Sequence, residues 1–401
     1  MKLAWFSNSP WAGTGYGAQT AEVLPRLKAD GHELCVVSNY GLAGAVMDWQ
    51  GIPVLPMGFE AYSNDLAGAH VANWIKGQGW GICLYDVWTI KGPLWNGVPL
   101  AAWVPVDHDP APAEVANWFR IPGELRLPIA MSKFGKERLE SAGLKDVMYA
   151  PHSVNTQLYT ESGNNFREQL GIPKDVHLTV INGANKGVPS RKSFPEMLAA
   201  WSIFAKDRKD AWLYLHTDQN GLAGGIQLKR LLAAVQAPED RIRFVPQYQY
   251  RSGIPTEEMP AVYRMGDVLL STSRGEGFGV PVLESLAVGV PAIVSDWTAQ
   301  PELLGAGWKV SGQPEWNEGM ASWWLCPNIG EIVAALEESY AMKGDTKGSA
   351  TMAAQAREFA LGYDTDTVYA RYWRPILTEL ESRLPKPAAL NREQRRALKA
   401  K

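Results

Sequence analysis

Short apolar runs alternate with longer segments of helical periodicity along most of the chain. The run KLAWF precedes a helical stretch from Gly17 to Asp30, and further apolar runs follow. These further runs are ELCVVSN, WGICLYD, PLAAWVPVD and LPIAMS. Strands that are apolar at nearly every position and alternate with helices indicate a parallel sheet with helices on both faces. We therefore expect the fold class α/β, beginning with a doubly wound, Rossmann-like domain.

The same pattern begins again after VMYAPHSVNTQLY. The predicted strands of this second unit are HLTVING, AWLYLHTD, IRFVPQY, DVLLSTS and PAIVSD, with helices over residues 194–206 and 226–236. We expect Rossmann-like domains over residues 1–157 and 158–363. The last helical segment, Asp364 to Leu384, places Trp373 and Leu377 on one stripe, so residues 364–385 are expected to pack back on the first domain.

Charge is unevenly distributed over the 401 residues, whose net charge is -3. Residues 386–401 contain six Lys or Arg and one Glu, and this predicts a flexible basic tail that could contact nucleic acid. A solvated, frayed terminus is the commoner outcome for such a segment. The start of the chain lacks the signal-peptide pattern and no run of about 18 apolar residues occurs, so we expect a cytoplasmic protein without a transmembrane segment.

Glycines follow the first predicted strand in the stretch SNSPWAGTGYGAQT. Gly13, Gly15 and Gly17 bracket the expected start of a helix, where backbone N–H groups and the helix end favour an anion. The spacing departs from the G-x-G-x-x-G dinucleotide fingerprint. The alternative is a tight turn that needs glycine for its backbone.

Cations follow the first strand of the second unit in the stretch NGANKGVPSRKSF. Lys186, Arg191 and Lys192 come directly before a helix, an arrangement suited to a diphosphate. An exposed polar loop is the alternative interpretation.

The richest stretch is SRGEGFGVPVLESLAVGVPAIVS. Pro281 fits a first helical position, so the positive end of a helix lies beside the glycine-rich turn. Glu276 in that turn is better suited to sugar hydroxyls than to the phosphate position, and Glu284 lies one turn into the helix, in reach of a ribose. A helix cap at Glu276 and a surface role for Glu284 are the alternatives.

The E-x7-E arrangement of Glu276 and Glu284, within EGFGVPVLES and followed by AVGVPAIVS, resembles the donor-binding signature of retaining GT-B glycosyltransferases of glycosyltransferase family 4. Stretches similar to that family follow one another in the same order over most of the chain. They are TGYGAQT, GHELCVVSNYG, PVDHDPAP, MSKFGKERLESAGL, APHSVNT and ANKGVPSRKSF. The resemblance implies two facing domains, with the acceptor domain first and the nucleotide-sugar donor domain second.

The resemblance also implies roles for individual residues. Glu276 is expected to bind donor-sugar hydroxyls and Glu284 the ribose, while Lys192, with Lys186 or Arg191, neutralises the diphosphate. The glycine loop of the first domain is expected to close over the donor. The complete expected donor-binding set is Gly13, Thr14, Gly15, Asn185, Lys186, Arg191, Lys192, Arg274, Glu276, Gly277, Phe278, Gly279 and Glu284. Family members often carry a V-G-R pattern where this chain has Asn185 and Lys186.

The strand PLAAWVPVD leads into His108 and Asp109, where the resemblance implies a histidine or aspartate near the sugar. His108 is expected to orient an acceptor or to contact the donor sugar, although a single histidine often has a structural role. The expected catalytic set is His108, Asp109, Lys192 and Glu276. His152 resembles the family's turn at the domain crossing and is expected to be architectural.

The expected reaction moves a sugar from a UDP or GDP sugar to an acceptor hydroxyl with retention of configuration. Cations and a helix end can stabilise the leaving diphosphate, so neither metal nor cofactor is expected. The acceptor is expected to be a glycan or another sugar-bearing molecule. The alternatives are a hydroxymethylated base in DNA as the acceptor, a nucleotide-sugar epimerase or phosphorylase, a nicotinamide dehydrogenase, and a non-catalytic sugar or nucleic-acid binder.

Overall fold

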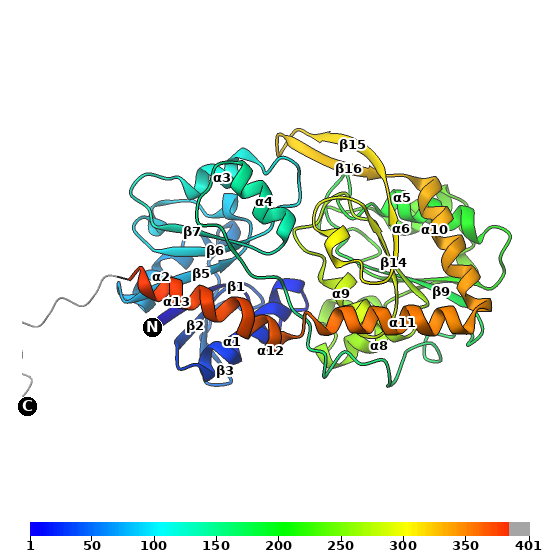
Figure 1. The fold of residues 1–401 in the computed structure, drawn as a ribbon, viewed down its shortest axis with the longest axis horizontal. Helices are drawn as coiled ribbons and strands as arrows, with labels where there is room; N and C mark the ends of the chain where they lie inside the picture. Colours follow the sequence, from blue (N-terminus) through cyan, green and yellow to red (C-terminus); the bar gives the residue numbers. More distant parts are fainter. Residues whose placement is uncertain (385–401) are drawn as a thin grey trace, which may run out of the picture.

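The computed structural model describes residues 1–384, which form two α/β domains side by side (Figure 1). The first domain contains an 8-stranded sheet of order β3-β4-β2-β1-β5-β6-β7-β8. All neighbouring strands in it are parallel except β3 and β4. The strands are β1 (Lys2–Asn8), β2 (Glu33–Tyr40), β3 (Met47–Trp49), β4 (Ile52–Leu55), β5 (Gly79–Leu84), β6 (Leu100–Val104), β7 (Arg126–Ala130) and β8 (Met148–Tyr149). The helices are α1 (Gly15–Ala29), α2 (Ala67–Ile75), α3 (Ala113–Phe119) and α4 (Lys133–Ser141).

The second domain contains a 6-stranded parallel sheet of order β11-β10-β9-β12-β13-β14. Its strands are β9 (His177–Asn182), β10 (Ala211–His216), β11 (Ile242–Phe244), β12 (Val268–Ser271), β13 (Ala292–Ser295) and β14 (Gly307–Val310). Its helices are α5 (Phe194–Ala205), α6 (Leu228–Ala234), α7 (Gln247–Ser252), α8 (Met259–Arg264), α9 (Val280–Ala287), α10 (Ile329–Ala341) and α11 (Thr346–Leu361).

The central strands are almost wholly buried because helices cover both faces of each sheet. Every residue of β5 and of β6 is buried, which explains why these runs show no polar alternation in the sequence. Each predicted strand of the two units is present. The predicted fold class, two Rossmann-like domains with parallel sheets, is confirmed.

A two-stranded antiparallel hairpin, β15 (Gly312–Asn317) and β16 (Ser322–Pro327), extends from the second domain towards the first along one edge of the molecule (Figure 1). The sequence analysis predicted no strands here. The backbone N–H of Asp109 donates to the Trp323 carbonyl over 3.0 Å, and the Trp323 N–H donates back over 3.2 Å. The hairpin therefore bridges the two domains.

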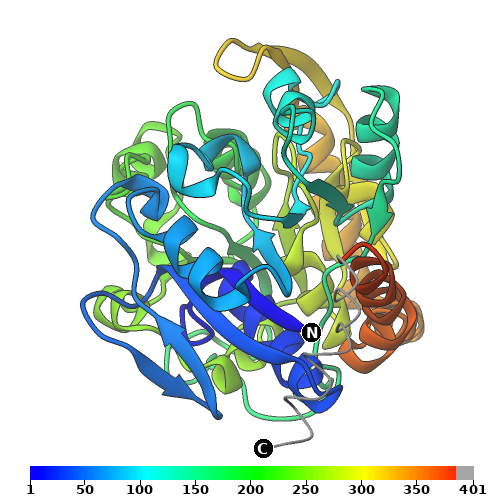
Figure 2. The same ribbon diagram turned by 90° about the vertical axis from the view of Figure 1, so that its left-hand side faces the viewer.

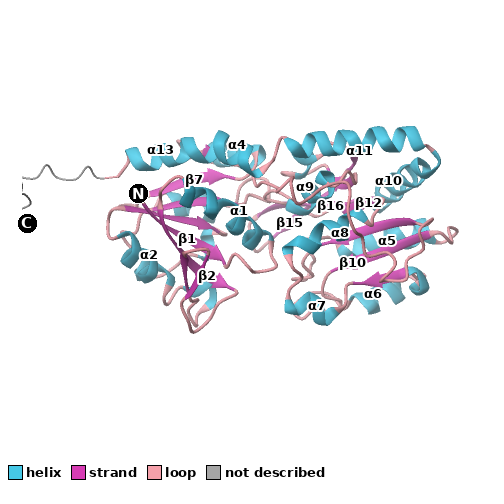
Figure 3. Cartoon of the chain, turned by 90° about the horizontal axis from the view of Figure 1, so that it is seen from below, coloured by secondary structure: helices cyan, strands magenta, loops and turns pink. Residues whose placement is uncertain are grey.

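The chain crosses between the domains twice, and the two crossings lie together. The Val154 N–H donates to the Tyr363 carbonyl over 3.1 Å, and the Thr365 N–H donates to the Val154 carbonyl over 3.2 Å. After the second crossing, α12 (Thr365–Val368), a π-helical turn (Tyr369–Trp373) and α13 (Arg374–Ser382) run along the first domain, while α11 lies along the second (Figure 3).

Trp373 fixes this C-terminal segment to the first sheet. Its ring centroid lies 5.7 Å from that of Trp5 and 4.9 Å from that of Trp103. The Trp80 indole N–H also donates to the Leu380 carbonyl over 2.8 Å. Figure 2, which looks onto the first domain, shows the segment along one side of it. The predicted basic tail, residues 386–401, lies outside the described residues, as does residue 385.

Candidate active site

The glycine-rich loop between β12 and α9 packs directly against the first domain. A Cβ atom on Gly275 would overlap the Asp107 carbonyl oxygen, and one on Gly277 would overlap Pro105. Gly279, which ends the loop before α9, has a φ of 115°, a backbone conformation that favours glycine. The glycines therefore allow the loop of the second domain to contact the segment that follows β6 in the first.

Glu276, in the middle of this loop, is 7% exposed and pairs with two cations. Arg191 Nη1 donates to Glu276 Oε2 over 3.0 Å, and Lys192 Nζ donates to Glu276 Oε1. Burial alone would raise the pKa of the Glu276 carboxyl, but Arg191 and Lys192 outweigh burial and lower the pKa to about 2. Glu276 is thus a carboxylate at neutral pH, held between Arg191 and Lys192.

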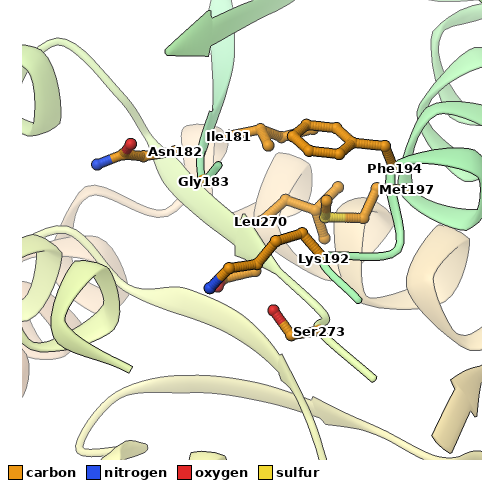
Figure 4. A pocket seen from close by; sticks show the side chains of 9 residues that line it. Ile181, Asn182, Gly183, Lys192, Phe194, Met197, Leu270 and Ser273 are labelled. Atoms are coloured by element: carbon orange, nitrogen blue, oxygen red, sulfur yellow. The ribbon is translucent and has the colours of Figure 1, made fainter. Parts of the chain in front are cut away.

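Lys192 lines a hollow at the carboxyl ends of β9 and β12 (Figure 4). Its ammonium group points away from Phe194 and Met197, which form the apolar end of the hollow, and Ser273 also lines it. Ser193, which follows Lys192, has a φ of 55°, so the chain turns sharply there before α5 begins. This turn directs Lys192 towards the loop that carries Glu276.

Asn185 and Lys186 do not join this cluster. The Asn185 side-chain amide donates to the carbonyls of Asp218 and Ile226 over 2.8 and 2.6 Å, and its oxygen accepts from the Ile226 N–H over 2.9 Å. It therefore holds the loop after β10 in place. Lys186 is exposed and forms no ion pair within residues 1–384. Of the candidates for the diphosphate, the structure brings Arg191 and Lys192 to Glu276.

Arg274 pairs with carboxylates other than Glu276 and ties the hairpin to the second domain. Its Nη2 donates to Glu196 Oε1 over 2.6 Å, its Nη1 pairs with Glu315 on β15, and its guanidinium lies 5.3 Å from the Trp324 ring centroid. Two carboxylates already balance its charge. Its geometry supports a structural role rather than the donor contact expected from the sequence.

His108 is enclosed between the two domains. Its Nδ1 lies 2.7 Å from Asp107 Oδ1, and its Nε2 lies 3.2 Å from Asn317 Nδ2 at the end of β15. The Trp324 ring is stacked on it, with centroids 5.8 Å apart. Because an amide nitrogen only donates, His108 Nε2 accepts the hydrogen bond from Asn317. The ring proton is therefore on Nδ1, which donates a hydrogen bond to Asp107. Both ring nitrogens are therefore used in this arrangement.

Asp109, the other residue expected beside His108, also serves the contact between domains. Its backbone pairs with Trp323 as described above, and its carboxylate lies 3.2 Å from Arg138 Nη1. These partners support a structural role for Asp109 in this state.

Two carboxylates that the sequence analysis did not assign complete the first-domain wall. Asp107 Oδ2 lies 3.8 Å from Arg191 Nε, so the Arg191 guanidinium contacts carboxylates of both domains. Burial raises the pKa of Asp86 to about 6, and the nearby charge of Asp107 adds to the shift. A signal was present in the sequence, since Asp86 and Asp107 end the runs WGICLYD and PLAAWVPVD at strand ends.

Glu284 lies in α9 and receives two tyrosine hydroxyls. Tyr159 donates to its Oε1 over 2.8 Å and Tyr263 to its Oε2 over 2.5 Å. The Asn182 amide in turn donates to the Tyr263 oxygen over 2.7 Å. Burial raises the pKa of Glu284 to about 7, although both tyrosines act in the opposite direction. The carboxyl group is thus held in a defined orientation, with both oxygens accepting hydrogen bonds.

The glycine loop of the first domain meets the start of α9. Thr14 caps α1, since its hydroxyl accepts from the Gly17 N–H over 3.0 Å. A Cβ atom on Gly15 would lie 3.9 Å from a Val280 methyl group, whereas Gly13 has no atom near that position. The loop thus faces the helix end that the sequence analysis connected with phosphate.

Phe278 and His152 form an apolar contact next to the loop. Phe278 is 4% exposed, and its ring centroid lies 5.1 Å from that of His152. His152 also packs on Trp103 with centroids 4.4 Å apart, and burial lowers its pKa to about 3. A neutral, packed histidine agrees with the architectural role expected for it.

The described residues contain no helix with the length and apolarity needed to span a bilayer. Within residues 1–384 there is also no cluster of three or more His, Cys, Asp or Glu side chains able to hold a metal ion.

The fold and part of the sequence are similar to those of known glycosyltransferases. Residues 187–339 match the family described as "Glycosyl transferases group 1". That segment contains Arg191, Lys192, Glu276 and Glu284, and its structural neighbours are GT-B glycosyltransferases. The chain has a GT-B fold, and part of its second domain is similar to the group 1 glycosyltransferases.

Three similar proteins illustrate the likeness. O-antigen chain mannosyltransferase B of Escherichia coli is 37% identical over 57 residues, or 14% of this chain and 15% of that protein. Sucrose-phosphate synthase from Thermosynechococcus elongatus has a TM-score of 0.71 at 15% identity, covering 94% of this chain and 99% of that chain. Anabaena HepE in complex with UDP and glucose has a TM-score of 0.67 at 17% identity, covering 94% and 100%. The chain spans less than half the length of each curated relative it matches.

Proposed function

We propose that the protein is a retaining glycosyltransferase of family 4 that transfers a hexose from a nucleotide diphosphate sugar to an acceptor hydroxyl. The observation that carries this proposal is the cluster of Glu276, Arg191 and Lys192 between two Rossmann-like domains. A group 1 domain match and the fold shared with HepE, which was solved with UDP and glucose, support it.

The site can stabilise a leaving diphosphate with fixed protein charges. As the bond between the sugar and the β-phosphate breaks, negative charge develops on the departing oxygen. Arg191, Lys192 and the N-terminal end of α9 are positioned before the reaction, and preorganised positive charge of this kind lowers the barrier. This assigns the charge-neutralising role to side chains and requires no metal ion.

Glu276 has two functions in this proposal. Without the donor it balances Arg191 and Lys192, and with the donor bound its oxygens accept hydrogen bonds from the sugar hydroxyls as the cations turn to the diphosphate. Glu284, oriented by Tyr159 and Tyr263, accepts from the ribose hydroxyls. His108 positions the first-domain wall through Asp107 and Asn317.

The two glycine loops complete the proposed donor site. In the loop of Gly13, Thr14 and Gly15, Gly15 approaches Val280 at the start of α9, and the loop around Gly277 packs against Pro105 of the first domain. Contact between the domains excludes water, which limits hydrolysis of the donor. We propose a glycan or another sugar-bearing molecule as the acceptor.

A thermal-shift panel of UDP-glucose, UDP-galactose, UDP-N-acetylglucosamine and GDP-mannose tests the donor site, because a ligand that binds only the folded state raises its melting temperature. We expect one of them to stabilise the wild type and to have no effect on Lys192→Ala. Stabilisation by none of them would contradict the proposal. Transfer of the sugar to an added acceptor, with the product anomer read by NMR, then separates a retaining transferase from an epimerase or a phosphorylase.

A further inference from the structure

A second hollow lies in the first domain outside the Glu276 cluster. It has a volume of about 460 Å3 and runs between the loop that follows Asp86 and helix α3, and we call it the α3 groove. Small-ligand sites have volumes of about 300–1,000 Å3. Its lining includes Trp88, Trp118, Lys91, Asn96, Glu114 and Asn117.

The groove is built partly from the chain segments that follow Asp86 and Asp109. Trp88 lies two positions after Asp86, and α3 starts shortly after the segment that contains His108 and Asp109. Both chain segments that build the first-domain wall of the active site therefore continue into the walls of the groove.

Trp88 offers an aromatic surface in the groove. It is only partly buried and packs edge-on against Tyr62, with ring centroids 6.3 Å apart and an interplanar angle of 67°. Trp118, by contrast, is buried beneath the Arg126 guanidinium, which lies 4.9 Å from its ring centroid. Trp118 thus belongs to the wall, and Trp88 supplies the surface on which an apolar sugar face can stack.

Polar side chains around the groove are available to a ligand. Lys91, Asn96, Glu114 and Asn117 are exposed, and their side chains make no hydrogen bond or ion pair with any other described residue. Side-chain amides both donate and accept, and together with a carboxylate and an ammonium group they match the mixed donor and acceptor pattern of sugar hydroxyls.

The charges of the groove favour a neutral ligand. Lys91 and Glu114 have opposite charges, and Arg126 is paired with Glu124 over 3.0 Å. Nucleic acids require an excess of cations, which this lining does not supply.

We propose that the α3 groove binds a neutral carbohydrate chain at a site separate from the donor site. The proposal rests on the proposed function only for the source of that carbohydrate chain, which would be an acceptor glycan. Binding of a carbohydrate to the groove is measurable without any transfer reaction, so the two proposals can fail independently.

The test uses the full chain labelled with 5-fluorotryptophan and observed by 19F NMR. The resonances of Trp88 and Trp316 are assigned with Trp88→Phe and Trp316→Phe. Cellotriose, maltotriose and mannotriose are each added up to about 10 mM, because a small neutral ligand in one groove can bind in the millimolar range. We expect at least one of them to shift the Trp88 resonance and to leave that of Trp316, an exposed residue on the hairpin, unchanged.

Two variants separate the groove from the donor site. Asn117→Ala is expected to weaken saccharide binding about fivefold, the size of one lost hydrogen bond, at an unchanged melting temperature. Lys192→Ala is expected to retain the binding. The proposal is overturned if none of the three saccharides shifts Trp88, if Trp316 shifts equally, or if Lys192→Ala abolishes the shift.

Discussion

Arg191 donates to Glu276 over 3.0 Å, so the cation that the sequence connects with phosphate binds a carboxylate in this state. The same guanidinium lies 3.8 Å from Asp107 of the first domain. Arg191 therefore contacts carboxylates of both domains. A diphosphate that binds between the domains must compete with Glu276 for the Arg191 guanidinium. Two predictions concern this competition.

Replacing the carboxylate separates sugar binding from phosphate binding. We expect Glu276→Gln to reduce transfer by about 100-fold or more. The amide is a poorer acceptor for sugar hydroxyls, and the substitution also changes the fixed arrangement of charges around the donor. UDP itself is expected to bind more tightly than to the wild type, because Arg191 and Lys192 lose their carboxylate partner. Calorimetry with UDP measures this, and weaker UDP binding would show that Glu276 does not compete with the diphosphate.

Removing a cation is expected to have the opposite effect on UDP affinity. Lys192→Ala is expected to lower transfer by about 100-fold and to weaken UDP binding, because it removes positive charge at the leaving group. Lys186→Ala is the matched control, since Lys186 is exposed and outside the cluster, and we expect less than about a threefold change. Equal effects of the two substitutions on donor kinetics would contradict the assignment of Lys192.

Close contact between the domains depends on Gly275. In Gly275→Ala the new methyl group meets the Asp107 carbonyl, so the contact should open at a cost of about 1–3 kcal/mol. We expect a larger radius of gyration by small-angle X-ray scattering and at least a tenfold loss of transfer, on the scale of about 1.4 kcal/mol per tenfold. Gly344→Ala is the control, since no atom lies within 4 Å of the position of its new methyl group. An unchanged radius of gyration together with full transfer activity in Gly275→Ala would show that this close contact between the domains is not needed for transfer.

Glu284 should make stability depend on pH. Its folded pKa of about 7 lies above the ordinary value of 4.5, so the folded protein holds a proton that the unfolded chain releases between these values. The wild type therefore loses stability as pH rises through this range, whereas Glu284→Gln does not titrate. We expect the variant to gain stability relative to the wild type from about pH 5 to pH 8, by no more than about 3 kcal/mol. Urea unfolding at both pH values measures it.

A control for this experiment is Glu331→Gln. Hydrogen bonds from Ser311 lower the pKa of Glu331, so it is ionised in both folded and unfolded chains over this range. The difference in stability between this variant and the wild type should stay constant with pH. A constant difference for Glu284→Gln as well would mean that the Glu284 carboxyl is not protonated in the folded state near neutral pH.

Much of the proposed donor site could be predicted from the sequence, because its residues lie within short strand-loop-helix segments. Arg191 and Lys192 precede one helix, and Glu276 precedes another, so strand-loop-helix patterns predict where they lie. Asn185 and Arg274 occur in the same loops, yet their side chains form hydrogen bonds with residues outside the Glu276 cluster. Sequence position placed all of these residues near the carboxyl ends of strands but did not determine the direction of each side chain.

The sequence by itself determined the two parallel sheets, because an apolar run between helices has few other ways to be buried. Only the tertiary structure decided which residues meet across the cleft. Asn317 reaches His108 from more than two hundred positions away through a hairpin that the pattern did not reveal, and Asp107 reaches Arg191 from the other domain. Periodicity reports the burial of neighbouring positions, whereas contacts between domains depend on the shapes of two finished surfaces.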